Sequence, residues 1–541
     1  MELEIFDKAR LEAVATALRG RDAKTAGLLA EFDLAQGVQH PLLFMARAVA
    51  LSEAGRHEEA LADFERAAHL SPSNPAAWSA LGICCSKLDR FDDAVEAFDK
   101  AIALRPNVAD FHYRKGRALE QALDRVAAKA AFQRALECDS AHSAALGRLA
   151  YGSAQQGASS EARAYADRAL AVDAQDQTAR LVHIMSDIRE GQLAQADSNL
   201  SAFLSDAAVS EHARATALGE LGDLRDRQGR IDEAFEAYSR ANDLTGTLYT
   251  GLVAGGLSTS ETVRALAGYF ENKERLHRFP APGIPAKGHA FLLGFLRSGT
   301  TLLEQVLASH PDVVTLEERG PDVDAVRHFM RAPHDLDPLY RASEQEIQKY
   351  RDLYWQRVRK HGVDPTNKVF VDKGPIQTVY LPVIARLFPD AKILFAIRDP
   401  RDVVFSCFRT RFGMNSTTYE LLTLQGAADL YAGVMRLAEI YRAVIPMDVH
   451  EVRHEAFVRN FDAEARRLCD VLGLEWSEAM RNFAERSKLG AIATASGPQI
   501  ARGLNQQGIG RWRPYRSHLT PVLPELQPWV EKFGYELQND D

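Results

Sequence analysis

The chain has 541 residues, of which 46% are hydrophobic and 26% charged, as in ordinary globular proteins. This length exceeds what a single hydrophobic core organises, so we expect at least two domains. The formal net charge of −9 excludes the broad basic surface of a general nucleic-acid binder or anionic-membrane binder. Any anion site must therefore be local.

Signals for targeting, membrane insertion and metal binding are missing from the sequence. Residues 1–7 lack the basic head and apolar run of a secretory signal, and no stretch reaches the roughly 18 apolar residues of a membrane span. We therefore expect a soluble, cytoplasmic protein without a membrane span. The five cysteines form no C-x-x-C pair and have no histidine at zinc-ligand spacing, so we expect neither disulfide bonds nor a metal site.

The first half of the chain repeats with a period of 34 residues. Six alanines follow one another at this step: Ala26, Ala60, Ala94, Ala128, Ala162 and Ala196. An aromatic series keeps the same step: Phe64, Phe98 and Phe132. Small residues recur where the two helices of one repeat must touch: Ala48, Gly82, Gly116 and Ala150. We expect Pro72 and Pro106 just beyond the second helix of their repeats, because proline cannot continue a helix.

This pattern resembles that of tetratricopeptide repeats. The resemblance implies helix pairs that stack into a curved solenoid, whose inner surface binds protein or peptide segments. It is clearest over residues 41–175 and degenerate over residues 1–40 and 176–244, so we expect a repeat array over residues 1–244. The alternative is an array that only dimerises the protein or carries a shape.

The sequence changes character after Thr245, where the alanine rhythm stops. Residues 279–285 hold three prolines and a glycine, which predicts a loop rather than a helix. We therefore expect a connector over residues 245–285 and a second domain over residues 286–541.

Short apolar runs alternate with helical patterns in this second domain. Residues 289–295, 368–372 and 392–397 are predicted as buried strands. Strands separated by helices build a parallel sheet, and ligands of such sheets bind outside the carboxyl ends of the strands. The predicted fold is therefore an all-α repeat array followed by an α/β domain.

The turn after the first predicted strand is rich in glycine and hydroxyl groups. Backbone N–H groups and the positive end of the following helix converge at such a turn, which suits a phosphate or sulfate. The spacing from Gly294 to Gly299 equals that of the nucleotide triphosphatase loop, but Thr300 stands where that loop needs lysine. A donor with only a 5′-phosphosulfate fits this departure better than ATP with Mg²⁺.

The turn resembles the P-R-S-G-T-T loop of the sulfotransferase family, with Leu296 in place of the proline. The whole chain resembles the bacterial, repeat-containing members, whose sulfotransferase domain is similar to protein-tyrosine sulfotransferases. The resemblance implies 3′-phosphoadenosine 5′-phosphosulfate as the donor and no metal. It assigns the 5′ end of the donor to Arg297, Ser298, Gly299, Thr300 and Thr301. The alternative is a turn that only caps a helix.

Two further strand ends carry charged groups that match this family. Arg398 follows the third strand and Ser406 stands eight residues later, and the resemblance assigns both to the donor's 3′-phosphate. Lys373 follows the second strand, and relatives place this lysine on the bridging oxygen, where it stabilises charge on the leaving phosphate. The alternatives are a surface ion pair for Arg398 and a solvated side chain for Lys373.

Residues 496–516 carry four arginines and no acid, which predicts a local anion patch. They resemble the closing segment of bacterial repeat-containing sulfotransferases, which implies Ser496 and Arg511 as donor contacts. Trp512 or Tyr515 is expected to stack on adenine. The alternative is a basic surface without a ligand.

Sulfuryl transfer also needs a base that takes the acceptor's proton. Protein-tyrosine sulfotransferases carry a glutamate pair at a matching distance from the loop, which implies Glu318 as the base and Glu317 as the fallback. His310 stays a third candidate, because many relatives use a histidine, although it precedes a proline at a predicted helix end. The alternative is two exposed acids in a loop.

The sequence thus predicts a sulfotransferase that acts on a hydroxyl or amine, with a protein or peptide tyrosine recruited by the array as the favoured acceptor. Two other hypotheses stay open. One is a repeat scaffold whose sulfotransferase-like domain binds nucleotide without turnover. The other is a Mg²⁺-dependent kinase, which Thr300 disfavours.

Overall fold

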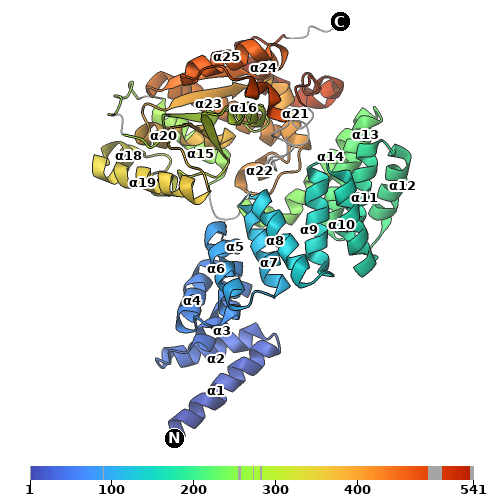
Figure 1. The fold of residues 1–541 in the computed structure, drawn as a ribbon, viewed down its shortest axis with the longest axis vertical. Helices are drawn as coiled ribbons and strands as arrows, with labels where there is room; N and C mark the ends of the chain where they lie inside the picture. Colours follow the sequence, from blue (N-terminus) through green and yellow to red (C-terminus); the bar gives the residue numbers. More distant parts are fainter. Residues whose placement is uncertain are drawn as a thin grey trace. The chain divides into compact units, whose positions relative to one another are not determined.

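The computed structural model describes residues 2–88, 90–122, 124–253, 257–271, 273–280, 283–484 and 503–536 (Figure 1). The chain divides into two compact units. The first consists of Met1–Ala154 and Ala158–His183, and the second of Gln155–Gly157 and Ile184–Asp541.

The first unit is built from paired helices. They are α1 (Glu2–Arg19), α2 (Ala23–Ala35), α3 (Pro41–Glu53), α4 (His57–Leu70), α5 (Pro75–Lys87), α6 (Phe91–Leu104), α7 (Ala109–Gln121), α8 (Arg125–Cys138), α9 (Ser143–Gln155) and α10 (Ser159–Val172). A Cβ atom on Gly82 would lie 2.8 Å from the ring of Phe98, and one on Gly116 would lie 2.5 Å from the ring of Phe132. The predicted close contact between the helices of one repeat is therefore confirmed.

The helix ends also follow the prediction. Helix α4 ends at Leu70 and α6 at Leu104, so Pro72 and Pro106 both stand just past a helix. Asn74 caps the next helix by accepting a hydrogen bond from the N–H of Ala76 at 3.1 Å.

The same architecture continues into the second unit. Its first helices are α11 (Gln177–Glu190), α12 (Leu193–Ser205), α13 (Glu211–Arg227) and α14 (Ile231–Leu248). The division between the two units falls within α11. Gly222 of α13 lies against the ring of Tyr238 of α14, which repeats the glycine–aromatic contact of the first unit. The α13–α14 hairpin thus belongs to the same compact unit as the sheet that follows it.

The predicted connector contains a helix, α15 (Thr259–Phe270), after the short 3₁₀ helix η1 (Thr250–Val253). Ser258 and Glu261 form a capping box at its start, and Val263, Leu266 and Phe270 are buried in the core of the second unit. The domain limits 1–244, 245–285 and 286–541 stay a prediction.

A five-stranded sheet follows, and its strands run parallel, as predicted. Its strands are β1 (Gly288–Leu293), β2 (Val313–Glu317), β3 (Val369–Lys373), β4 (Lys392–Ile397) and β5 (Asp448–Arg453), in the order β2-β3-β1-β4-β5. The three predicted strands are the three central ones, β3, β1 and β4. All strand pairs are parallel, so all the carboxyl ends lie at one edge of the sheet.

Helices cover both faces of the sheet, because alternate side chains of the strands point to opposite faces and both sets are apolar. One face packs against α16 (Thr300–Ala308), α24 (His454–Arg459) and α25 (Phe461–Leu472), which lie together in Figure 1. The other face packs mainly against α19 (Glu344–Lys360), α20 (Leu381–Leu387), α21 (Pro400–Arg409) and α23 (Leu424–Val444).

The remaining short elements are α17 (Val323–Phe329), α18 (Asp337–Arg341), η2 (Pro375–Tyr380), α22 (Ser416–Glu420), η3 (Glu478–Asn482), η4 (Arg513–Tyr515), α28 (Arg516–Leu519), η5 (Thr520–Val522) and α29 (Leu523–Lys532). Among the described residues, no helix combines the length and the apolar character that crossing a membrane requires.

Candidate active site

The turn between β1 and α16 is shaped by two glycines. Gly299 has φ of 99° and directly precedes α16, and a Cβ atom there would lie 2.5 Å from Nδ1 of His454. Gly294 has φ of 149°, and its Cβ would lie 2.7 Å from the carbonyl oxygen of Ala396. Any larger residue would therefore push the turn away from β4 and α24. Helix α16 begins at Thr300, so the positive end of its dipole lies at this turn, where it favours an anion.

The hydroxyl residues of the turn are held inside it. Ser298 is 2% exposed and donates a hydrogen bond to the carbonyl oxygen of Phe295 at 2.6 Å. Thr300 and Thr301 are buried in the first turn of α16. These residues hold the shape of the turn, which is the condition for its N–H groups to converge.

Arg297 and Ser406 lie together, although they are 109 residues apart in the sequence. Nε of Arg297 donates to Oγ of Ser406 at 3.1 Å, and the backbone of Arg297 is left-handed, with φ of 66°. Burial, assisted by the nearby cations Arg398 and Arg409, lowers the pKa of Arg297 to about 10. Several positive charges thus gather beside the turn, which favours a multiply charged anion.

Arg398 completes this cationic group from the end of β4. Its Nη1 donates to the carbonyl oxygen of Arg297 at 3.0 Å, and its Nη2 donates to the carbonyl oxygen of Gly508. Its Nε is buried and has no hydrogen-bond partner among the described residues. A guanidinium is a permanent cation with five N–H donors, so an unsatisfied buried donor beside Arg297 fits an anionic ligand.

A second charged group lies at the same edge of the sheet. Lys373 ends β3 opposite Leu292 of β1, so it lies next to the glycine turn. Its fully buried Nζ donates to Oε1 of Glu318 at 2.7 Å and to Oε1 of Glu317 at 3.1 Å. Burial alone lowers the pKa of Lys373, but Glu318, Glu317 and Glu304 outweigh it and raise this pKa, so the lysine stays protonated.

The glutamate pair is fixed by the end of β2. Glu317 is the last residue of this strand, and Glu318 directly after it has φ of 50° and donates its backbone N–H to the carbonyl oxygen of Lys373 at 2.7 Å. Their side chains are 16% and 26% exposed, respectively. Glu318 is thus reachable from solvent while the lysine behind it is not.

Two residues near these groups were missed in the sequence. Glu304 of α16 is 3% exposed, and its carboxylate accepts hydrogen bonds from Oγ1 of Thr315 at 2.7 Å and Nε2 of Gln305 at 3.1 Å. Burial, assisted by Glu317, raises the pKa of Glu304 to about 7. The sequence did carry a signal for Glu304, because it is the one acid on the otherwise mostly apolar helix that follows the turn.

The second missed residue is His454, at the start of α24, whose ring closes over Gly299. Burial and the neighbouring Arg398 lower its pKa to about 3, so the ring is neutral. Nothing in the sequence places His454 near a turn 155 residues earlier.

His310 lies away from these groups. It follows α16, which begins at the carboxyl edge of the sheet, and it precedes β2, so it lies at the opposite edge. Its Nε2 contacts the carbonyl oxygen of Glu475 at 2.8 Å, and its Nδ1 accepts the N–H of Asp312 at 3.0 Å. Both ring nitrogens are engaged in holding the end of the helix.

The C-terminal segment is placed differently from the prediction. Trp512 is 3% exposed beneath the guanidinium of Arg401, 4.1 Å from it, and Tyr515 is 1% exposed against Phe405. The expected stacking of either ring on adenine is therefore wrong, because protein side chains cover both rings. Arg511 pairs with Asp226 of α13, and its predicted contact with a donor stays a prediction.

Ser496, the other predicted donor contact of this segment, lies outside the described residues. Within the described part of the chain, no cluster of histidine, cysteine and acidic side chains suits a metal ion.

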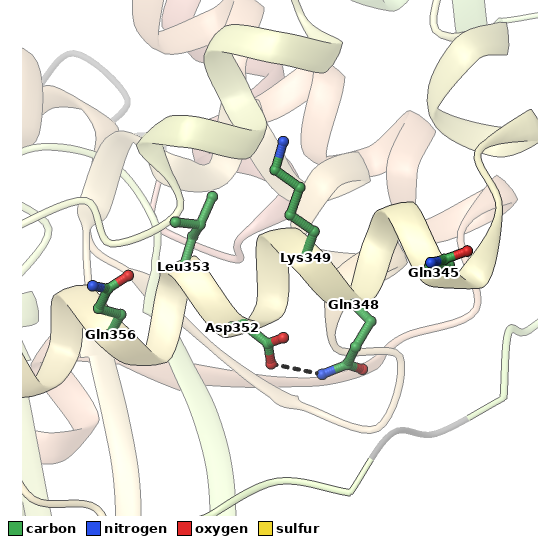
Figure 2. A pocket seen from close by; sticks show the side chains of 6 residues that line it. All are labelled: Gln345, Gln348, Lys349, Asp352, Leu353 and Gln356. Carbon is green, nitrogen blue, oxygen red and sulfur yellow. Dashed lines mark hydrogen bonds between the residues drawn. The ribbon is translucent and has the colours of Figure 1, made fainter.

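A hollow elsewhere on this unit carries no matching chemistry. Figure 2 shows that it is lined along α19 by Gln345, Gln348, Lys349, Asp352, Leu353 and Gln356. The hydrogen bond from Gln348 to Asp352, at 2.9 Å, joins two side chains of the same exposed helix face. None of these residues belongs to the charged groups at the sheet edge.

Comparisons with known proteins agree with this architecture. Residues 290–478 match the model of the sulfotransferase family, and residues 51–119 match that of the tetratricopeptide repeat. An uncharacterized protein of Aquifex aeolicus (strain VF5) is 24% identical over 348 residues, which are 62% of this chain and 44% of that protein. The chain therefore spans less than half the length of this relative.

Protein-tyrosine sulfotransferase 1 of Danio rerio is 26% identical over 264 residues, covering 46% of this chain and 72% of the relative. Among solved structures, the sulfotransferase domain of the Synechococcus PCC 7002 olefin synthase is 21% identical, with a TM-score of 0.36, and covers 48% of this chain and all of that chain. Residues 290–478 thus form a sulfotransferase-family domain, in a chain that carries tetratricopeptide repeats over residues 51–119.

Proposed function

We propose that the second unit transfers a sulfuryl group from 3′-phosphoadenosine 5′-phosphosulfate to an acceptor hydroxyl. One observation carries the proposal. A group of arginines that can bind an anion and a lysine–glutamate pair lie at the same edge of one parallel sheet, at the ends of neighbouring strands. The anion site supplies binding, and the pair supplies one acid and one base.

The donor fits the cationic residues of this edge. Arg398 and Ser406 are the proposed ligands of the 3′-phosphate, and the unsatisfied Nε of Arg398 is the donor that a phosphate oxygen would complete. The turn from Ser298 to Thr301, which lies at the positive end of α16, and the side chain of Arg297 are the proposed binding groups for the 5′ end. These contacts need no metal ion.

The reaction itself is assigned to Lys373 and Glu318. The acceptor oxygen forms a bond to sulfur in line with the bond that breaks, which joins sulfur to the oxygen of the nucleotide's 5′-phosphate. Glu318 takes the proton of the acceptor hydroxyl, and the buried positive charge of Lys373 stabilises the negative charge that grows on the leaving phosphate oxygen. The ion pair with Glu318 and Glu317 keeps Lys373 charged.

A protein or peptide tyrosine is the proposed acceptor, bound in part by the repeats. Relatives named protein-tyrosine sulfotransferase support this acceptor, as does the solvent-reachable position of Glu318. Tetratricopeptide solenoids commonly bind extended polypeptides, which supports recruitment by the array. The glutamate at position 317 and the buried His310 are less suited as bases, since the first is more covered and the second lies at the other edge.

The test combines binding and turnover in the full-length chain. Calorimetric titration should show binding of adenosine 3′,5′-bisphosphate and none of ATP with Mg²⁺. Incubation with labelled donor and tyrosine peptides should label the peptides with the wild type but not with Glu318→Gln, which should still bind the bisphosphate. Exchange of the exposed Glu525 to Gln is the matched control and should leave both signals unchanged.

Arg398→Ala should weaken bisphosphate binding by about 10-fold or more, because a charge-assisted bond is lost. Near-normal turnover in Glu318→Gln would overturn the base assignment. Bisphosphate binding without transfer to any acceptor would favour a nucleotide-binding scaffold, and tight binding of ATP with Mg²⁺ would favour a kinase.

A further inference from the structure

The last repeat hairpin, α13–α14, contacts the helix that carries Ser406. Helix α21 ends at Arg409, whose Nη2 lies 3.0 Å from Oδ1 of Asp223 and whose Nη1 lies 3.7 Å from Oδ2 of Asp226. Arg411, just beyond the helix, lies 2.7 Å from Glu220 and 3.2 Å from Asp223. Three acids spaced three residues apart on α13 thus face the arginines at the end of α21.

Packing makes this contact close and specific. A Cβ atom on Gly219 would lie 2.7 Å from the side chain of Arg411, so this side chain lies directly against the backbone of α13. Nδ2 of Asn242 donates to the carbonyl oxygen of Phe408 at 2.9 Å, which satisfies a carbonyl of the last turn of α21. The ring of Phe235 stacks on that of Phe408 with centroids 5.3 Å apart.

Asp226 also holds the segment that contacts Arg398. Its Oδ1 accepts a hydrogen bond from the hydroxyl of Tyr515 at 2.7 Å, and its Oδ2 pairs with Arg511. The ring of Tyr515 packs on Phe405, the neighbour of Ser406, with centroids 4.2 Å apart. The same segment contributes the carbonyl of Gly508 that binds Nη2 of Arg398.

These contacts form a continuous path from the repeat hairpin to the anion site. Asp223 fixes the end of α21 through Arg409, and Asp226 fixes residues 508–515 through Tyr515 and Arg511. Although burial alone raises its pKa, Arg411 and Arg409 hold the pKa of Asp223 below its ordinary value, so its charge persists at neutral pH. Contacts of this kind hold the side chains that bind a ligand at fixed positions relative to one another.

We infer that Asp223 and Asp226 of the last repeat hairpin are positioning residues of the nucleotide site, which set the affinity for the 3′-phosphate through Arg409, Arg511 and Tyr515. The inference rests on the proposed function for the identity of the nucleotide. In this view the α13–α14 hairpin supports the nucleotide site of the second unit, and its role differs from that of a repeat that recruits a partner.

The test compares two nucleotides that differ only in the 3′-phosphate. The dissociation constants of adenosine 3′,5′-bisphosphate and adenosine 5′-monophosphate are measured by calorimetry on the full-length chain, and their ratio reports preference for the 3′-phosphate. Asp226→Asn should lower this preference about 10-fold. A general loss of folded protein would reduce the active fraction for both nucleotides alike and leave the ratio unchanged.

Three further variants sharpen the result. Asp197→Asn, which removes a 2.7 Å ion pair between α12 and Arg225 of α13, should keep the wild-type ratio. Asp226→Glu should restore most of the preference. Tyr515→Phe, which deletes one hydrogen bond without changing charge, should lower the preference about threefold. If Asp226→Asn does not fold, the result for Tyr515→Phe decides the question.

A ratio within about twofold of wild type in both Asp226→Asn and Tyr515→Phe overturns the inference. A wild-type chain that shows no preference for the 3′-phosphate overturns the proposed function as well, so the two failures are distinguishable.

Discussion

The buried carboxyl of Glu304 makes the stability of the second unit depend on pH. Its pKa in the folded chain is about 7, against an ordinary value of 4.5, because it is 3% exposed and lies near Glu317. Below pH 4.5 the group is protonated in both the folded and the unfolded chain. Between pH 4.5 and 7 the unfolded chain loses this proton while the folded chain keeps it, so the free energy of unfolding falls as pH rises.

The magnitude follows from the size of the shift. Each pKa unit corresponds to 1.36 kcal/mol, so ionised Glu304 costs about 3 kcal/mol above pH 7. Glu304→Gln has nearly the same shape and does not titrate. The difference in the free energy of unfolding between the variant and wild type should therefore shift by about 3 kcal/mol in favour of the variant as the pH rises from 4.5 to 8. The altered hydrogen bonds of the variant add a change that does not depend on pH and so does not affect this shift.

Urea unfolding at several pH values between 4.5 and 8, followed by tryptophan fluorescence, measures this difference. Four of the five tryptophans lie in the second unit: Trp355, Trp476, Trp512 and Trp529. Glu525→Gln, on the exposed face of α29, should run parallel to wild type. Parallel profiles for wild type and Glu304→Gln would refute the reasoning, because Glu304 would then titrate alike in both states.

Three other substitutions test packing. Gly299→Ala should weaken bisphosphate binding about 10-fold, because its φ of 99° and the contact with His454 both oppose a methyl group; calorimetric titration measures this. Gly116→Ala should lower the unfolding free energy of the first unit by about 1–2 kcal/mol in urea unfolding, since its Cβ would meet the ring of Phe132. Trp512→Ala should cost the second unit about 3–5 kcal/mol, seen as a lower midpoint in scanning calorimetry, because the ring is fully enclosed.

Each of these variants has a matched control. Gly473→Ala also places alanine at a positive φ, of 66°, but without a neighbour within 4 Å, and should leave nucleotide binding unchanged. Gly152→Ala adds a methyl to an open helix position and should be neutral or stabilising by up to about 1 kcal/mol. Trp529→Ala removes a half-buried ring and should cost less than Trp512→Ala. Equal effects in a variant and its control would contradict the packing argument for that site.

The central strands could be predicted from the sequence, whereas the edge strands could not. Both faces of β1, β3 and β4 are buried, so these strands read as continuous apolar runs. The edge strand β5 has the sequence Asp-Val-His-Glu-Val-Arg, and most of its side chains are only half-buried, so it carries no such run. The other edge strand, β2, ends at Glu317 and is also only partly buried, and it was not among the predicted strands.

The side chains that directly follow a strand could also be located, because parallel strands end at one edge. Arg297, Arg398 and Lys373 gather there, as expected from their positions in the sequence. His454 and Asp226 could not be found this way, because their contacts arise only when segments more than 150 residues apart pack together. The burial of Trp512 under Arg401 likewise depends on tertiary packing that local sequence does not encode.

Four residues other than glycine adopt positive φ among those described, and two of them, Arg297 and Glu318, lie at the proposed site. Each such backbone costs roughly 1–2 kcal/mol, which glycine would recover. Laboratory evolution for heat resistance alone would therefore reward replacement of these two residues and erase the chemistry they support. Thermostable variants of this protein should be sought with both positions held constant.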